Sequence, residues 1–114
     1  MKITELIEKT GWKVLAGDPA ASPDAEGVYC GDLLSWVMSH GDSGMAWVTV
    51  QTHMNVIAVA VLSEMACVIL PEGIEMEAES LEKATTEGMV VLQSPLTAFD
   101  ICGRMAKKGI PAQN

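Results

Sequence analysis

The chain has 114 residues, of which 49% are hydrophobic and 19% are charged, so one domain can bury its own core without disulfides or metal ions. Fifteen acidic residues against seven basic ones give a net charge of -8, and the basic residues are scattered except for Arg104, Lys107 and Lys108, so we do not expect a nucleic-acid binder. No apolar run reaches the ~18 residues of a membrane span, and the first residues lack the pattern of a secretory signal, so we expect a cytoplasmic protein that does not insert into a membrane.

The predicted elements alternate between strands and helices. Short apolar runs predict strands at residues 12–16, 27–31, 46–50, 67–70 and 89–92. Helical spacing of apolar residues predicts helices at residues 4–9, from residue 32 to the break at 41–44, at 55–63, at 75–87, and from residue 94 to the tail. Residues 17–26 predict a surface loop, and the tail at 109–114 is expected to fray. This order predicts a single domain with a three-layer α/β/α fold around a mostly parallel sheet of about five strands.

Particular residues are expected to begin or line these helices. Thr4 and Asp32 are predicted caps of the first two helices, and Thr52 or Asn55 is the predicted cap of the third. The last helix is expected to start at Ser94-Pro95, since proline suits a first turn. Its predicted apolar stripe consists of Leu96, Phe99, Ile101, Cys102 and Met105.

Residues 45–73 are the centre of the prediction, because they read as strand, helix and strand. A polar cluster at 51–55 follows the first strand, and Pro71-Glu72-Gly73 follows the second. The carboxyl ends of parallel strands meet at one edge of a sheet, which is where ligands usually bind. We therefore expect ligand-binding residues at this edge: Gly31, Asp32, Gln51, Thr52, His53, Asn55, Glu72, Gly73, Ser94 and Thr97.

The polar cluster at 51–55 has two interpretations. The free N–H groups at the start of the following helix can bind an anion, with His53 as an additional donor. Alternatively, one side chain caps the helix, and His53 lies on the surface or against a partner chain.

Catalysis has little support from the sequence. The chain has no GxxxxGK[ST], no GxGxxG after a strand, no HExxH and no GxSxG, and we expect no cofactor and no catalytic residues. The alternative hypothesis is a small enzyme that uses His53 as general acid or base with Asp32 or Glu72. A weaker alternative is a metal site formed by His53 with Cys30 or Cys67, although the three cysteines are expected to be reduced core residues.

Several segments together resemble the DRTGG domain family. They are the run 48–73, the helix around Leu81-Glu82-Lys83-Ala84, Glu87-Gly88-Met89-Val90-Val91-Leu92, Ser94-Pro95-Leu96-Thr97-Ala98, and the N-terminal segments 13–17 and 28–34. The resemblance covers nearly the whole chain. The residues that name the family differ, because Thr52-His53 stands where the family has Asp-Arg, and of Thr-Gly-Gly only Gly73 matches.

The resemblance implies a regulatory or assembly role. Members of the family are accessory domains beside CBS pairs in pyrophosphatases and within phosphotransacetylases, they resemble the N-terminal domain of HPr kinase, and they tend to pair as dimers. We accordingly expect a non-catalytic regulatory or interaction module that senses a small anionic metabolite or nucleotide, or acts on a partner protein such as a metabolic enzyme. We also expect a homodimer, because Trp36, Trp47 and eight methionines are more apolar surface than a monomer of this size needs to bury.

Overall fold

A strand, helix and strand at residues 45–70 form the centre of the computed structural model, which describes residues 1–113. β3 (Met45–Val48) and β4 (Cys67–Leu70) are parallel neighbours, and α3 (Met54–Leu62) connects them. Every residue of both strands is buried, because helices cover both faces of the sheet. The predicted adjacency of these two strands is confirmed.

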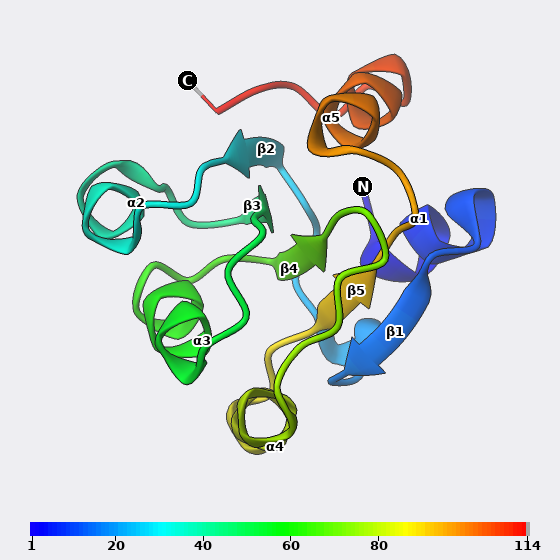
Figure 1. Ribbon diagram of the computed structural model, residues 1–114. Helices are drawn as coiled ribbons and strands as arrows, with labels where there is room; N and C mark the ends of the chain where they lie inside the picture. The colour runs from blue at the N-terminus through cyan, green and yellow to red at the C-terminus, as the bar shows by residue number, and fades with distance from the viewer. Residues whose placement is uncertain (114) are drawn as a thin grey trace.

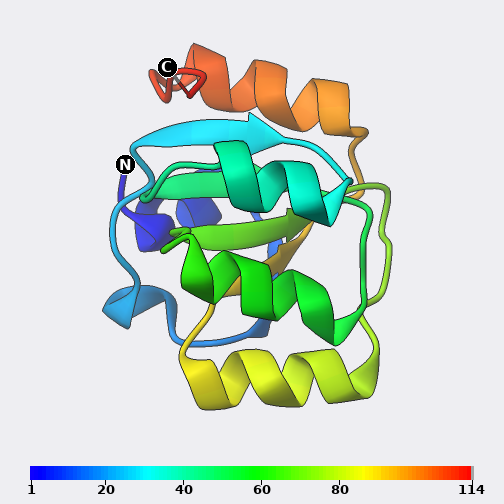
Figure 2. The same cartoon turned by 90° about the vertical axis from the view of Figure 1, so that its left-hand side faces the viewer.

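The remaining elements complete a five-stranded sheet between two layers of helices. They are α1 (Ile3–Thr10), β1 (Lys13–Ala16), the short 3-10 helix η1 (Pro19–Ala21), β2 (Gly27–Cys30), α2 (Leu34–His40), α4 (Ala78–Glu87), β5 (Val91–Gln93) and α5 (Ala98–Lys107). The strand order is β1-β5-β4-β3-β2, with only β1 antiparallel (Figure 1). Helices α2, α3 and α4 cover one face, while α1 and α5 lie on the other (Figures 1 and 2). The predicted three-layer α/β/α fold is confirmed.

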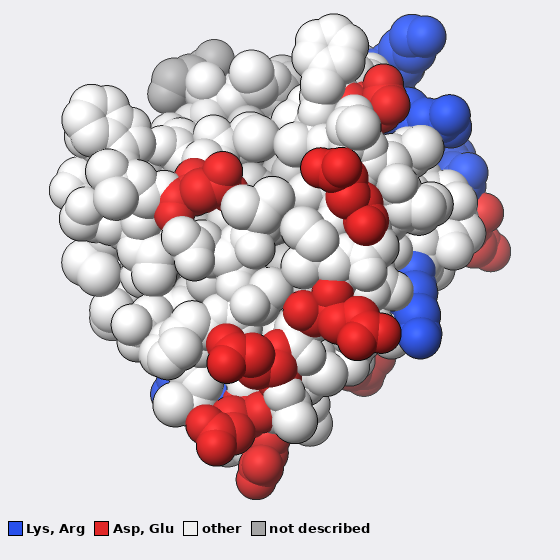
Figure 3. Space-filling view, viewed as in Figure 1, with Lys and Arg blue, Asp and Glu red and all other residues white. Residues whose placement is uncertain are grey.

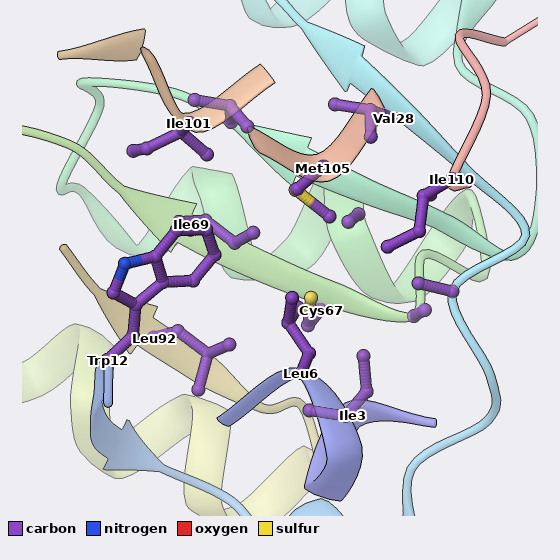
Figure 4. Packing of buried hydrophobic residues seen from close by; sticks show 14 of the residues in the cluster. Ile3, Leu6, Trp12, Val28, Cys67, Ile69, Leu92, Ile101, Met105 and Ile110 are labelled. Atoms are coloured by element: carbon purple, nitrogen blue, oxygen red, sulfur yellow. The ribbon is translucent and has the colours of Figure 1, made fainter. Parts of the chain in front are cut away.

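Alternate residues of the central strands supply two separate cores. Cys67 and Ile69 point to the face covered by α1 and α5, where Figure 4 shows them with Leu6 and Met105. Val68 and its neighbour Trp47 belong to the other core, beneath α2, α3 and α4. This alternation follows from the two-residue period of a strand, and it explains why neither central strand carries a polar face.

The expected cap of α1 and one residue of the expected apolar stripe of α5 are wrong. Helix α1 begins at Ile3 behind Lys2, which makes no side-chain cap, so Thr4 is not the cap. Phe99 does not belong to the apolar stripe of α5, because its side chain is 85% exposed. Ile101 and Met105 face the sheet, and a residue two positions before Ile101 lies roughly 200° around the helix from it.

The C-terminal residues run along β2 rather than hanging free. Ile110 is buried, the Val28 amide donates to the Pro111 carbonyl at 2.9 Å, and the Gln113 amide donates to the Val28 carbonyl at 3.1 Å. The fraying expected for residues 109–114 stays a prediction, and residue 114 lies outside the described residues. The pairing is possible because β2 has no strand on its outer side.

The apolar residues behind the dimer expectation are less exposed than predicted. Trp47 is fully buried, and most of the methionines fill the core, including Met45, Met65 and Met89. Trp36 and Met38 on α2 remain more than half exposed. Within residues 1–113, no helix combines the length and apolar character needed to cross a membrane.

A substitution at Gly17, directly after β1, tests how closely this segment packs against the residues before β5. It has a φ of +83°, and a Cβ there would lie 2.8 Å from the Met89 carbonyl oxygen, whereas a Cβ at Gly88, with φ of +73°, would meet nothing within 4 Å. We predict that Gly88→Ala lowers the free energy of unfolding by about 1–2 kcal/mol, the cost of the left-handed conformation. Gly17→Ala should lower the free energy of unfolding by a further ~1–3 kcal/mol, because the backbone at Met89 must move to make room for the Cβ. Urea unfolding of both variants checks this, and equal costs would contradict the packing described.

Candidate functional site

Four strand ends meet at one edge of the sheet. Because β2, β3, β4 and β5 are parallel and in register, Cys30 lies beside Val48, and Leu70 lies beside Gln93. The residues that follow these strands therefore share this edge, which faces the viewer in Figures 1 and 3. The edge carries the predicted site residues in two groups, one after β2 and β3 and the other after β4 and β5.

In the first group, the carboxylate of Asp32 binds the end of β3. Asp32 Oδ1 accepts hydrogen bonds from Thr49 Oγ1 and from the Val50 amide, both at 2.9 Å, and Gln51 Nε2 donates to the Asp32 carbonyl at 2.9 Å. Asp32 is therefore not the cap of α2, whose N-cap is Leu33 without a side-chain bond. Sequence reasoning missed Thr49, a buried residue in an apolar run. Its hydroxyl group was the only sign in the sequence that this position takes part in the site.

The other residues of this group also have structural contacts. The Gly31 carbonyl accepts from the indole N–H of Trp47 at 2.9 Å. His53 is the N-cap of α3, and its Nδ1 accepts from the Asn55 amide at 3.2 Å. The predicted caps Thr52 and Asn55 are both wrong, because α3 begins at Met54 and places His53 at the capping position.

The second group joins the loop after β4 to the loop after β5. The Gly73 amide donates to the Ser94 carbonyl at 2.9 Å, and the Glu72 amide donates to the Leu96 carbonyl at 2.8 Å. Ser94 is buried, and its hydroxyl accepts from the Leu96 amide at 3.2 Å in a turn that precedes the helix. Thr97 caps α5, so this helix does not start at Ser94-Pro95. Backbone amides of the first loop thus bind backbone carbonyls of the second loop.

The edge as a whole is acidic. Asp32 and Glu72 lie on it, and exposed glutamates of α4 and its approach, such as Glu77 and Glu79, border it. In Figure 3, acidic side chains spread over this face and gather over α4, while most of the visible Lys and Arg atoms lie along the right-hand margin and a few at the lower left. Among the predicted site residues His53 is the only candidate cation. Long-range electrostatics therefore disfavour an anion here.

His53 faces carboxylates other than those expected. A hollow of about 260 Å³ is lined by His53, Met54, Glu77, Ala78, Glu79 and Ser80. Across residues 1–113, the only ion pair joins Lys9 to Glu5 at 3.1 Å, so no carboxylate is paired with His53. The side chain of Asp32 is engaged by Thr49 instead. One of the two carboxylates that the enzyme hypothesis pairs with His53 is thus bound to the end of β3.

The residues proposed for a metal site are also separated. Cys67 lies in the core beneath α1 and α5, whereas His53 caps α3 on the opposite face. Cys30 instead has the thiol of Cys102 as its neighbour. Among residues 1–113, no three His, Cys, Asp or Glu side chains are grouped as a metal ion would need.

A basic surface on α5 was not included in the predicted site. A shallow hollow of about 710 Å³ is lined by Phe99, Asp100, Gly103, Arg104, Lys107 and Lys108. Arg104, Lys107 and Lys108 are three of the seven basic residues of the chain. Their spacing of three and four residues puts them on one side of a helix, which was the signal available in the sequence. We call Phe99, Arg104, Lys107 and Lys108 the α5 surface.

Comparison with known proteins identifies a solved structure of the same fold. A scan against protein-family models finds no match, and no curated protein matches the chain. The solved structure is the CBS and DRTGG regulatory region of Clostridium perfringens pyrophosphatase in complex with its activator, diadenosine tetraphosphate. It superposes with a TM-score of 0.74 at 12% identity, over 96% of this chain and 47% of that one. The chain shares the fold of part of that regulatory region.

The bond between Asp32 and Thr49 provides a test of the first group. Asp32→Ala leaves the buried Thr49 hydroxyl and the Val50 amide without this partner, so we expect the free energy of unfolding to fall by ~1–3 kcal/mol. In the double variant with Thr49→Val, the loss should be smaller than the sum of the single losses by about 1 kcal/mol. Asp24→Ala, in the exposed loop before β2, is the control and should change stability by less than ~0.5 kcal/mol. Strict additivity would show that the bond contributes nothing.

Proposed function

We propose that this chain is a regulatory module that acts by binding and not by catalysis, as a divergent member of the DRTGG domain family that works as a homodimer in the cytoplasm. The shared fold with a pyrophosphatase regulatory region supports the regulatory role. The observation that carries the proposal is the exposed apolar surface of α2. Large apolar side chains in water are typical of surfaces that bind another protein.

This surface consists of Leu33 and Trp36, which are 67% and 56% exposed and lie three residues apart on α2. Met38 is 54% exposed but lies roughly 200° around the helix from Trp36, so it is not part of this surface. The buried Val37 anchors α2, so the exposed side chains project from a fixed helix. Trp36 stacks on the ring of His40 with centroids 3.9 Å apart, which holds the indole against the helix. We propose a second copy of the chain as the occupant, because a dimer buries the same apolar patch on both partners.

The polar edge of the sheet supports a binding role more than an enzymatic one. Its side chains already bond to backbone, as with Asp32 and Ser94, and these bonds fix the loops. The enzyme alternative requires His53 to meet Asp32 or Glu72, and His53 instead caps α3 beside Glu77 and Glu79. The proposal also includes a partner protein, such as a metabolic enzyme, which this chain would regulate by binding and without carrying out a reaction itself.

A nucleotide or other small anion is the ligand that we propose for the module. The related fold was solved with diadenosine tetraphosphate, which supports this class of ligand. From the sequence we expect the site at the strand ends around Thr52, Gly73 and Ser94, where the acidic surroundings weigh against an anion. The α5 surface competes with that location, because Phe99 offers a stacking face beside the cations of Arg104 and Lys107.

The oligomeric state tests the α2 surface. We expect light scattering of the full chain to give about 24 kDa, twice its mass of 12.1 kDa. A Leu33→Ser/Trp36→Ser variant removes the apolar contact and should return about 12 kDa at the same concentration. Phe99→Ser, on the exposed part of α5, is the matched control and should remain a dimer. A monomer of the unaltered chain at all concentrations would contradict the homodimer.

Thermal unfolding with ATP, diadenosine tetraphosphate and inorganic phosphate tests the ligand. At ten times its Kd, a ligand adds roughly 1.4 kcal/mol of stability, which raises the melting temperature by about 5 °C for a domain of this size. His53→Ala and Arg104→Ser/Lys107→Ser distinguish the two locations, because only the variant at the true site loses the shift. If none of the three anions raises the melting temperature of the unaltered chain, the ligand part of the proposal fails. The interaction role then depends on the measured oligomeric state alone.

A further inference from the structure

Two cysteines meet at the seam between β2 and α5. Cys30 is the last residue of β2, and Cys102 lies one turn into α5, which packs against β2. Both line a groove of about 430 Å³ whose other walls are almost entirely apolar: Val28, Phe99, Gly103, Ala106, Ile110 and Ala112. Cys30 is exposed and Cys102 is half-buried, so small molecules in solution can reach the pair.

The two thiols are neighbours and are not equivalent. Burial and, to a smaller extent, the neighbouring Cys30 raise the pKa of Cys102 to about 11. Burial raises the pKa of Cys30, the hydrogen bond from Cys102 lowers it, and the nearby Asp32 carboxylate raises it. Cys30 is therefore the thiol that loses its proton more readily and is more accessible, and Cys102 is positioned to react second.

The third cysteine provides a contrast within the same chain. Cys67 is fully buried among Leu6, Ile69 and Met105, and burial raises its pKa to about 12 (Figure 4). It has neither access to solvent nor a second thiol beside it, so it serves as an inert internal reference.

We propose that Cys30 and Cys102 are a thiol oxidation site that closes into an intramolecular disulfide when a hydroperoxide reaches the groove. The Cys30 thiolate attacks the peroxide oxygen, which forms a sulfenic acid on Cys30 and releases an alcohol or water. The Cys102 sulfur then attacks the Cys30 sulfur, the S–S bond forms, and the hydroxyl leaves as water. The sum is two thiols and one hydroperoxide giving one disulfide, one alcohol and one water. A small dithiol reverses the reaction by exchange.

The position of the pair makes this bond consequential for the fold. Cys30 lies at the outer edge of the sheet, and Cys102 belongs to the helix layer above it, so the bond covalently joins β2 to α5. Because the two thiols line the same groove, closure requires their side chains to turn toward each other until the S–S bond can form. In a reducing compartment such a bond would be transient, as expected for a redox-responsive site.

The test treats the full folded chain with hydrogen peroxide and follows it by intact mass and peptide mapping. We expect a loss of about 2 Da, the mass of two hydrogen atoms, with Cys30 linked to Cys102 and Cys67 still free. We also expect a higher melting temperature that dithiothreitol reverses. Cys30→Ser and Cys102→Ser should both abolish the loss, and Cys67→Ala should retain it.

The single variants also separate the roles of the two thiols. Cys102→Ser should accumulate the sulfenic acid on Cys30, which dimedone traps, whereas Cys30→Ser should react much more slowly. The proposal is overturned if peroxide only adds oxygen to Cys30 of the unaltered chain, if the bond links two chains, or if either single variant still loses about 2 Da.

Discussion

The burial of β3 and β4 on both faces is the constraint on which the rest of the structure depends. These two strands have no polar side, so helices must cover the sheet above and below, and the chain must cross over between parallel strands. That crossing puts the ends of four parallel strands at one edge. The polar residues that gather there are the consequence, and their first task is to satisfy the backbone at the strand and helix ends.

The strength of this constraint also decides what the sequence could reveal. Residues 67–70 and the adjacency of the two central strands were predictable, because an apolar run of that length fits a strand buried on both faces. The cap roles of Asp32 and of Thr52 or Asn55, and the place of Phe99 in an apolar stripe, were predicted wrongly, because each depends on a neighbour remote in sequence or on a shift of a residue or more in a helix start. Asp32 could cap a helix by local rules, but Thr49, 17 residues away, binds its carboxylate. The spacing of the basic residues of the α5 surface was visible in the sequence, but the exposure of Phe99 beside them was not.

The candidate site and the outer surfaces therefore play different parts. At the strand ends, hydrogen bonds within the chain use most polar groups, and the remaining carboxylates make the edge acidic. Exposed apolar side chains on α2 and basic side chains on α5 form two further surfaces. If the chain acts as the binding module proposed above, it would bind through its exposed apolar and basic surfaces. The polar loops at the strand ends would then serve to fix the ends of the strands and helices.

The strand-like pairing of the C-terminal residues with β2 has a consequence for how other chains can approach. An exposed edge strand invites an extended peptide to continue the sheet, either in recognition or in aggregation. Here Val28 already exchanges hydrogen bonds with Pro111 and Gln113, which occupy that position. The opposite edge is β1, whose pairing with β5 shifts register between Val14 and Ala16, and such an irregularity makes an edge a poor template. An added strand could therefore pair with β2 at Val28 only after residues 111–113 have moved away.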